Sequence, residues 1–184
     1  MDNQFQKDTT ATGETTQTAF IDEQTRKEYF EKLRQEQNLS LGLIGGLGAA
    51  LVCALIWVVI TVWTGYQISY MPIGIGIAVG FAIRFLGKGI DIIYGILGAV
   101  LSLFGCLLGD FLSIYGFLAN AYNMSYFEIF GQLDLSMAID TFVENTDFMS
   151  VLFYGVAIFV GFTSAKESPS DEDILAYAVE KQNA

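Results

Sequence analysis

The 184-residue chain contains no histidine and only two prolines. Without an imidazole it cannot build a Ser-His-Asp triad, a histidine-ligated zinc or haem site, or a histidine proton shuttle. Charged residues make up 16% of the chain, well below the roughly one quarter that is usual in soluble domains. The composition therefore excludes histidine-dependent enzymes and disfavours an ordinary soluble domain.

Basic residues are scarce as well. Only 9 Lys and Arg stand against 20 Asp and Glu, which gives a net charge of −11. A nucleic-acid binder neutralises phosphates with clustered Lys and Arg, so we expect no nucleic-acid partner. Apolar residues, in contrast, make up 53% of the chain, and 19 glycines come in addition.

Three long stretches carry no formal charge: residues 37–83, 92–109 and 148–165. A membrane-spanning helix needs about 20 largely apolar residues, so the first stretch is long enough for two spans. Aromatic and small polar residues alternate at 64–70, just before Pro72, as expected of a turn at a membrane surface. We therefore predict four transmembrane helices, at about 40–63, 71–86, 91–112 and 148–165.

The predicted fold class is all-α: a polytopic membrane protein whose four transmembrane helices form a four-helix bundle in the lipid bilayer, with amphipathic helices outside it. A tail at 1–38 precedes the membrane part at 39–165, and an acidic tail with a short helix follows at 166–184. An acidic outer connection at 113–147 joins spans three and four. All basic residues lie in the tails or around the turn between spans two and three, so the positive-inside rule places both termini in the cytoplasm.

The N-terminal tail has two parts. Its first 19 residues are rich in Thr, Gln and Asp and have little to bury, which predicts disorder. Residues 25–28 then have the form of a capping box, and apolar residues continue on one side of a helix to about residue 37. This helix is either a docking or membrane-surface helix or a solvated extension of the first span.

The outer connection contains a second amphipathic pattern, predicted as a helix at 135–145. Its acidic face is suited to gathering cations or meeting a basic partner, and it also fits a plain solvated surface. The apolar face consists of Leu135, Ile139, Phe142 and Val143, and the acidic face of Asp140, Glu144 and Asp147.

Small residues recur at a spacing of four on every predicted span. In lipid, helices associate where small residues let their backbones approach closely, so these positions are expected to pack helix against helix. They are Gly42 and Gly46, Gly76 and Gly80, Gly105 and Gly109, and Ala157 and Gly161.

Asp110 is the only carboxylate that adjoins the apolar part of the third span. An ionisable residue in a membrane segment is a functional candidate, and we take Asp110 as a candidate ion or partner contact. Counted from Asp91 at about 1.5 Å per residue, it lies roughly 28 Å away, near the opposite membrane interface. The two carboxylates therefore cannot form a catalytic dyad. We predict no catalytic residue, metal site or cofactor.

The sequence GFAIRFLGKGID at 80–91, followed by GAVLSLFGCLLG at 98–109, resembles a segment of small, uncharacterised bacterial multi-pass integral-membrane proteins. The resemblance covers about 40 residues around spans two and three. It implies a bacterial cytoplasmic membrane, and it brings no activity and no site residues.

These observations lead us to expect a non-catalytic subunit or assembly factor of a larger membrane complex, rather than an enzyme. It would associate with another membrane protein, or with copies of itself, through its glycine-rich helix faces. The alternative is a small cation channel or transporter with an acidic outer vestibule. That function usually requires polar groups near the membrane midplane, and beyond the glycines only Thr61 and Ser102 offer them.

Overall fold

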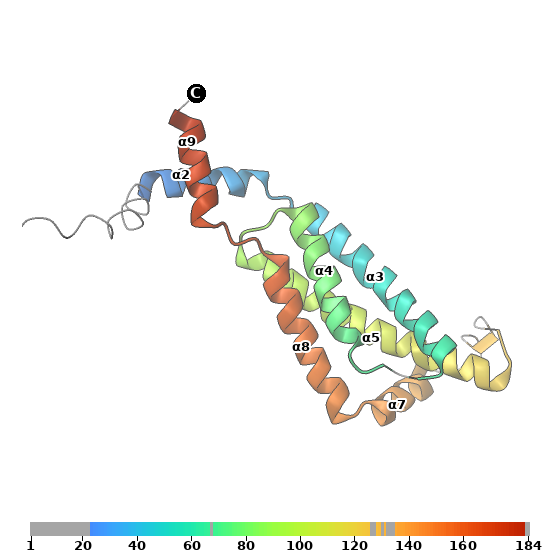
Figure 1. Cartoon of the computed structure of the whole chain (residues 1–184). Helices are drawn as coiled ribbons and strands as arrows, with labels where there is room; N and C mark the ends of the chain where they lie inside the picture. The colour runs from blue at the N-terminus through green and yellow to red at the C-terminus, as the bar shows by residue number, and fades with distance from the viewer. Residues whose placement is uncertain (1–22, 67, 126–127, 130, 132–134, 183–184) are drawn as a thin grey trace, which may run out of the picture. The chain divides into compact units, whose positions relative to one another are not determined.

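The structure, a computed structural model, is all-helical, which confirms the predicted fold class at this level. It describes residues 23–66, 68–125, 128–129, 131 and 135–182, and this part of the chain contains no strand. The first 19 residues, predicted to be disordered, lie outside the described residues. The helices are α2 (Glu23–Glu36), α3 (Leu39–Thr64), α4 (Met71–Gly87), α5 (Ile92–Tyr122), α7 (Leu135–Asn145), α8 (Phe148–Ala165) and α9 (Asp171–Gln182) (Figure 1).

Three helices are long and apolar enough to cross a membrane: α3 with 26 residues, α5 with 31 and α8 with 18. The fourth apolar helix, α4, is shorter, with 17 residues. The four apolar segments expected from the sequence are thus all helical, and three of them have the length of a span.

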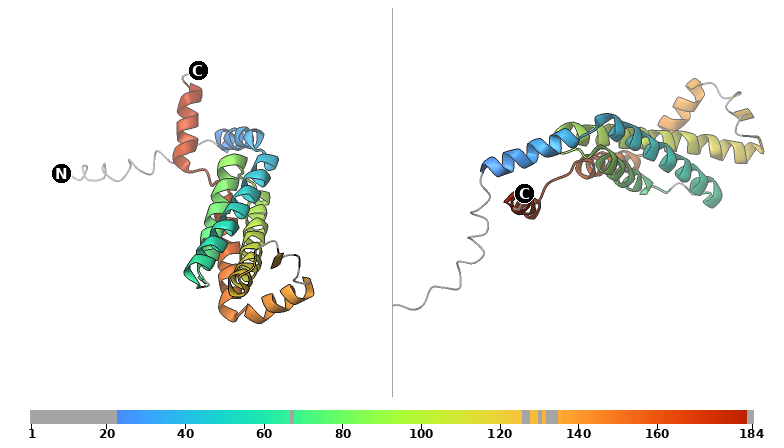
Figure 2. Two further views of the ribbon diagram at one scale, coloured as in Figure 1. Left: turned by 90° about the vertical axis from the view of Figure 1, so that its right-hand side faces the viewer. Right: turned by 90° about the horizontal axis from the view of Figure 1, so that it is seen from above.

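The chain divides into two compact units. The terminal unit joins the N-terminal part up to Glu36 to the C-terminal part from Ser168, and its described helices are α2 and α9. The apolar unit, Gln37–Glu167, contains α3, α4, α5, α7 and α8. In the apolar unit α3, α4, α5 and α8 lie side by side, as two further views show (Figure 2).

Local sequence signals set the helix ends in the apolar unit. Asn38 caps α3, and its side chain accepts a hydrogen bond from the Leu41 N–H. Gly65 ends α3 in the left-handed conformation, with φ of 72°, which costs glycine little. Pro72 then lies in the first turn of α4, where its missing N–H leaves no intrahelical bond unmade. The turn expected at 64–70 therefore lies between α3 and α4.

Small residues bring the helices of the apolar unit into backbone contact. All eight positions named from the four-residue spacing are buried. A Cβ built on Gly76 of α4 would lie 2.6 Å from the carbonyl oxygen of Ala157 in α8. A Cβ on Gly98 of α5 would lie 2.3 Å from the carbonyl oxygen of Gly161. Because these contacts involve backbone atoms, neither glycine can be enlarged without moving a helix.

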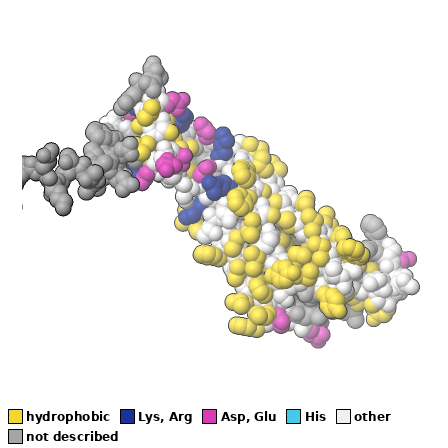
Figure 3. All heavy atoms as spheres, in the orientation of Figure 1, with side chains coloured by type: hydrophobic (Ala, Val, Ile, Leu, Met, Phe, Trp, Pro, Cys, Tyr) yellow, Lys and Arg dark blue, Asp and Glu magenta, His cyan; other side chains and the backbone are white. Residues whose placement is uncertain are grey.

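Hydrophobic side chains cover the outside of the apolar unit. Ile44 and Val59 on α3 and Phe159 on α8 are each about two thirds exposed, and Figure 3 shows the hydrophobic face, with Lys and Arg gathered at one end of it. A water-soluble protein rarely exposes apolar surface on this scale, whereas lipid favours it. We call the end where Arg84, Lys88 and Lys166 lie the basic end, and the end with the α3–α4 turn the distal end.

The structure departs from the predicted boundaries in two places. Helix α5 continues to Tyr122, ten residues beyond the predicted end of the third span. The reason is that Tyr115 and Ala119 pack with Ile129 in a second small core, until Asn123 ends the helix with φ of 54°. The outer connection is therefore shorter than residues 113–147. In addition, α2 begins at Glu23, so Thr25 lies within its first turn and does not precede the helix.

Candidate functional site

Asp110 is buried inside the apolar unit, with only 4% of its surface exposed. The preceding residue, Gly109, packs directly against α3. A Cβ built on Gly109 would lie only 2.6 Å from the six-membered ring of Trp57 in α3. The missing side chain lets α3 approach α5 at this level. The carboxylate therefore lies among packed helices and does not point out from their surface.

Tyr154 of α8 provides a partner for this carboxylate. Its hydroxyl donates a hydrogen bond to Oδ2 of Asp110, and the tyrosine is itself buried. One turn along α5, the buried hydroxyl of Ser113 donates to the carbonyl oxygen of Gly109, at 2.7 Å. The pair of Asp110 and Tyr154 thus joins α5 to α8 by a polar contact within an otherwise apolar core.

A small cavity of about 10 Å³ adjoins this pair. A volume of that size corresponds to about one water molecule. Its lining comes from α3, from α4 and the turn before it, from α5 and from α8, and it consists of Trp57, Ser69, Pro72, Asp110, Ser150 and Tyr154.

Two buried polar groups on α3 have no hydrogen-bond partner among the described residues. They are Nε1 of Trp57 and, one turn further along the helix, Oγ1 of Thr61. Trp57 is 2% exposed and Thr61 is fully buried. An unpaired buried donor or acceptor costs free energy, so these groups mark a place where a polar ligand or a water would be stabilised.

The three acidic residues predicted to share a helix face are separated. Helix α7 ends at Asn145, and Asp147 caps α8, so it is not on the α7 face. Its Oδ1 accepts hydrogen bonds of 2.8 Å from both N–H and Oγ of Ser150, and these bonds lower the pKa of the Asp147 carboxyl. Asp140 and Glu144 remain exposed on α7. Of the three, only Asp147 is linked to the Asp110 cavity, through Ser150.

The predicted apolar face of α7 is only partly described. Ile139 and Phe142 line an apolar groove of about 290 Å³ together with Phe104, Leu107, Leu108 and Phe111 of α5. Val143 is exposed, and the side chain of Leu135 lies outside the described residues.

The described residues offer no cluster of three or more His, Cys, Asp or Glu that could hold a metal ion. Cys53 and Cys106 are both free thiols. The Cys106 thiol lies 4.0 Å from the carbonyl oxygen of Pro72, within the hydrogen-bond limit for sulfur. Both cysteines pack between helices, as small hydrophobic residues do.

The basic end of the apolar unit is tied together by polar contacts. The guanidinium of Arg84 lies 3.6 Å from the carboxylate of Glu167. The backbone N–H of Glu167 donates to the carbonyl oxygen of Gly89, at 2.8 Å. The backbone N–H of Asn38 donates to the carbonyl oxygen of Gly87, at 2.9 Å. These bonds fix the entry of α3 and the exit of α8 beside the α4–α5 turn.

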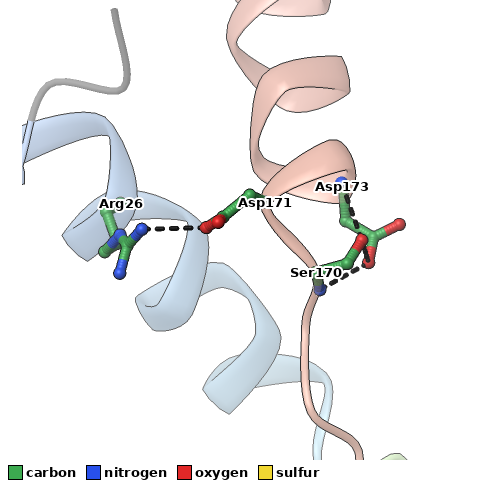
Figure 4. A network of polar contacts seen from close by, with 4 residues as sticks. All are labelled: Arg26, Ser170, Asp171 and Asp173. Carbon is green, nitrogen blue, oxygen red and sulfur yellow. Dashed lines mark hydrogen bonds and ion pairs between the residues drawn. The ribbon is translucent and has the colours of Figure 1, made fainter. Parts of the chain in front are cut away.

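In the terminal unit, α2 and α9 contact each other through charged and aromatic residues. Arg26 and Asp171 form an ion pair of 2.9 Å (Figure 4), and Lys181 pairs with Glu28. The Lys181 ammonium lowers the pKa of Glu28, and Glu28 raises that of Lys181. The rings of Tyr29 and Tyr177 lie 5.3 Å apart. The helix predicted at 25–37 is thus a separate helix that pairs with the C-terminal one.

The first turn of α9 is closed by a reciprocal cap (Figure 4). The N–H and hydroxyl of Ser170 both donate to Oδ2 of Asp173, at 2.9 and 2.8 Å. These bonds lower the pKa of the Asp173 carboxyl. The short helix expected in the acidic tail at 166–184 is thus α9, which begins directly after Ser170.

Comparisons with protein-family models, with curated proteins and with solved structures gave no match. The candidate site therefore rests on the geometry of this chain. Sequence reasoning selected Asp110, named Thr61 only as one of the few polar residues near the midplane, and missed Tyr154, Trp57 and Ser150. A hydroxyl or indole N–H within an apolar span was the available signal, but it does not tell which helices are neighbours.

Proposed function

We propose that this protein is a non-catalytic subunit or accessory factor of a larger membrane complex, with a four-span bundle in a bacterial cytoplasmic membrane. Its fourth span would be α4, whose 17 residues at about 1.5 Å each give about 26 Å, close to a hydrocarbon core of roughly 30 Å. Arg84, Lys88 and Lys166 at the basic end support a cytoplasmic location for that end and for both termini.

The observation that carries this proposal is how few residues are buried in the described part of the terminal unit. Helix α2 has no buried residue, and Ile174 is the buried hydrophobic residue of α9. Helices of 14 and 12 residues are marginal in water without a packed face. Val179 of α9 is 57% exposed and offers apolar surface for one. The paired ends thus have the properties of a docking element.

The packing of the apolar unit supports a scaffold more than an open pore. Gly76 and Ala157 bring α4 against α8, and Gly98 and Gly161 bring α5 against α8, in each case at backbone distance. Because the chain's own helices occupy these small-residue faces, a partner in the membrane would contact the exposed apolar side chains instead.

The test is to purify the protein from its own membrane in mild detergent and to measure its mass and bound chains by native mass spectrometry. We expect a second polypeptide at a fixed ratio. It should be lost when residues 1–36 are deleted and in Val179→Asp, and kept in Glu180→Gln, which changes an exposed polar neighbour on α9. A pure monomer or homo-oligomer from the native membrane would contradict the subunit proposal.

A small cation channel or transporter is the second candidate, and the buried Asp110 beside Tyr154 favours it. Ion flux into vesicles containing the purified protein tests this function. Flux that falls in Asp110→Asn, or in the corresponding variants of Asp140, Glu144 or Asp147, would support it. Equal flux in all four variants and in empty vesicles would contradict it.

A further inference from the structure

The carboxylate of Asp110 has no basic residue of its own chain nearby in sequence. No Lys, Arg or His occurs between residues 35 and 83 or between residues 89 and 165, and these segments build the region around the site. A buried ionised carboxylate is costly without a compensating positive charge. The negative charge of the Asp110 carboxylate must therefore be compensated by something other than a basic side chain of these segments.

The size of the adjoining cavity limits which group can compensate the charge of Asp110. At about 10 Å³ it holds roughly one water molecule, which is stable only where it has two to four polar partners. Asp110 can accept a hydrogen bond from such a water, and three hydroxyl-bearing residues, Ser69, Ser150 and Tyr154, line the same cavity. Ser69 is exposed, so the cavity lies next to the distal surface.

The indole of Trp57 favours a water molecule over a metal ion as the occupant of this cavity. It lines the cavity, and its buried Nε1–H has no partner among the described residues. An indole N–H is only a donor, so it is satisfied by a water oxygen and is unfavourable beside a metal cation. The lining therefore fits a water that donates to Asp110, with the compensating charge of the carboxylate supplied by a proton.

We propose that Asp110 is a reversible proton-binding site, which exchanges protons with the distal surface through one water held in the cavity lined by Trp57, Asp110 and Tyr154. A hydronium ion in solution gives its proton to the Asp110 carboxylate, which becomes a neutral carboxylic acid, and one water is released. Proton loss reverses this step. The hydrogen bond from Tyr154 favours the ionised form, so Tyr154 positions and tunes the carboxylate.

In the described part of the chain, few titratable groups face Asp110 from the surrounding helices. Cys106 of α5 and Asp147 at the start of α8 are near enough to interact electrostatically with the Asp110–Tyr154 pair. The lining residues from α3 and α4 are Trp57 and Pro72, which do not titrate. Asp140 and Glu144 of α7 are exposed. Among the described residues, Asp110 is thus the buried carboxyl group of this region.

The experiment uses Trp57 as the reporter. The chain has two tryptophans, so in the variant Trp63→Phe all tryptophan emission comes from Trp57, and Trp63 is 87% exposed and can be replaced without opening the core. The full chain is placed in phosphatidylcholine vesicles, and emission is followed as pH is varied. We expect the Trp57 emission to change with pH around a single midpoint. The further substitution Asp110→Asn should abolish this change, and the matched control Asp140→Asn should keep it.

A constant emission at all pH values would overturn the proposal, and so would a pH-dependent change that persists in Asp110→Asn. Replacing choline by Na⁺ at fixed pH should leave the emission unchanged. A Na⁺-dependent change would overturn the proton site and indicate a metal-ion site instead. Infrared spectra provide a second readout, because a protonated Asp110 adds a carboxylic-acid carbonyl band that Asp110→Asn removes.

If Asp110→Asn does not fold, Tyr154→Phe keeps the test decisive. It removes the hydroxyl that stabilises the ionised carboxylate and retains Asp110 itself. We expect the Trp57 midpoint to move to higher pH in this variant. An unchanged midpoint would overturn the proposal. Neither result depends on whether the protein has a partner in the membrane.

Discussion

The hydroxyl of Tyr154 donates a hydrogen bond to the carboxylate of Asp110, across 44 residues of sequence and between two packed helices. Both side chains are buried, so this hydrogen bond is made away from water. This contact differs from the glycine contacts around it, because it fixes one specific pairing of α5 with α8 where apolar packing alone would tolerate sliding. Polar contacts between helices have this ordering role in membranes.

Removing the Tyr154 hydroxyl tests how much this contact contributes. In Tyr154→Phe the buried Asp110 loses this donor, and removing one partner of a buried hydrogen bond costs about 1–3 kcal/mol. We expect a lower thermal unfolding midpoint in detergent. The matched control is Tyr122→Phe at the end of α5, where the tyrosine is 65% exposed and its hydroxyl is not buried in the core. Equal midpoints for the two variants would show that the Tyr154 contact does not stabilise the fold.

Two glycines on one helix test the close packing of α4 against α8. A methyl group at Gly76 would press against the backbone of Ala157, whereas nothing lies within 4 Å of a Cβ at Gly74. Overpacking of this kind costs about 1–3 kcal/mol, so Gly76→Ala should unfold at a lower temperature than the parent protein. Gly74→Ala should unfold at the same or a slightly higher temperature, because alanine favours helix. A reversed order would mean that α4 and α8 do not meet at Gly76.

The contact between the two chain ends can be tested by exchanging charges. Arg26→Asp places two carboxylates together at the Arg26–Asp171 pair, which should loosen α9 and speed amide hydrogen exchange along it. The double variant with Asp171→Arg restores opposite charges and should restore slow exchange. The effect should shrink at high salt, since both side chains are at least half exposed. Equal exchange in all three proteins would count against the pairing of α2 with α9.

Much of the helical layout follows from the distribution of charge along the sequence. The uncharged stretch 148–165 coincides with α8, because Asp147 caps its start and Lys166 follows its end. The predicted helix at 135–145 has the bounds of α7. At Asp110, in contrast, charge indicated the end of a span, and the helix continues through it. A single carboxylate did not end the helix because Tyr154 provides a partner inside the core.

The composition of the site could not be predicted from the sequence in the same way. Spacing places Gly109 and Asp110 on α5 and Trp57 on α3, but it does not say which helices are neighbours or at what height. That information comes from contacts such as the one between Gly109 and the Trp57 ring. The acidic spacing of Asp140, Glu144 and Asp147 misled for a related reason, because it assumed a helix through Thr146, where the chain turns and Asp147 begins a new one.

The cap of α8 gives a prediction about pH. Hydrogen bonds from Ser150 hold the folded-state pKa of Asp147 below its ordinary value of 3.8. A carboxyl group with a lowered folded-state pKa contributes stability above its ordinary pKa and loses that contribution as the pH falls through the lowered value. The unfolding midpoint of the parent protein should therefore approach that of Asp147→Asn as the pH falls below about 3.8, because asparagine still caps the helix but carries no charge.

Asp147→Ala distinguishes the cap from the charge. It removes the acceptor for the Ser150 N–H, so its midpoint should lie below that of Asp147→Asn at every pH. Other carboxylates titrate in the same range, and comparing variants at each pH cancels their effect. The measurement is the thermal midpoint in one detergent from neutral to acidic pH. A constant gap between the parent protein and Asp147→Asn over that range would contradict a lowered pKa, and coincident curves for the two variants would contradict the cap.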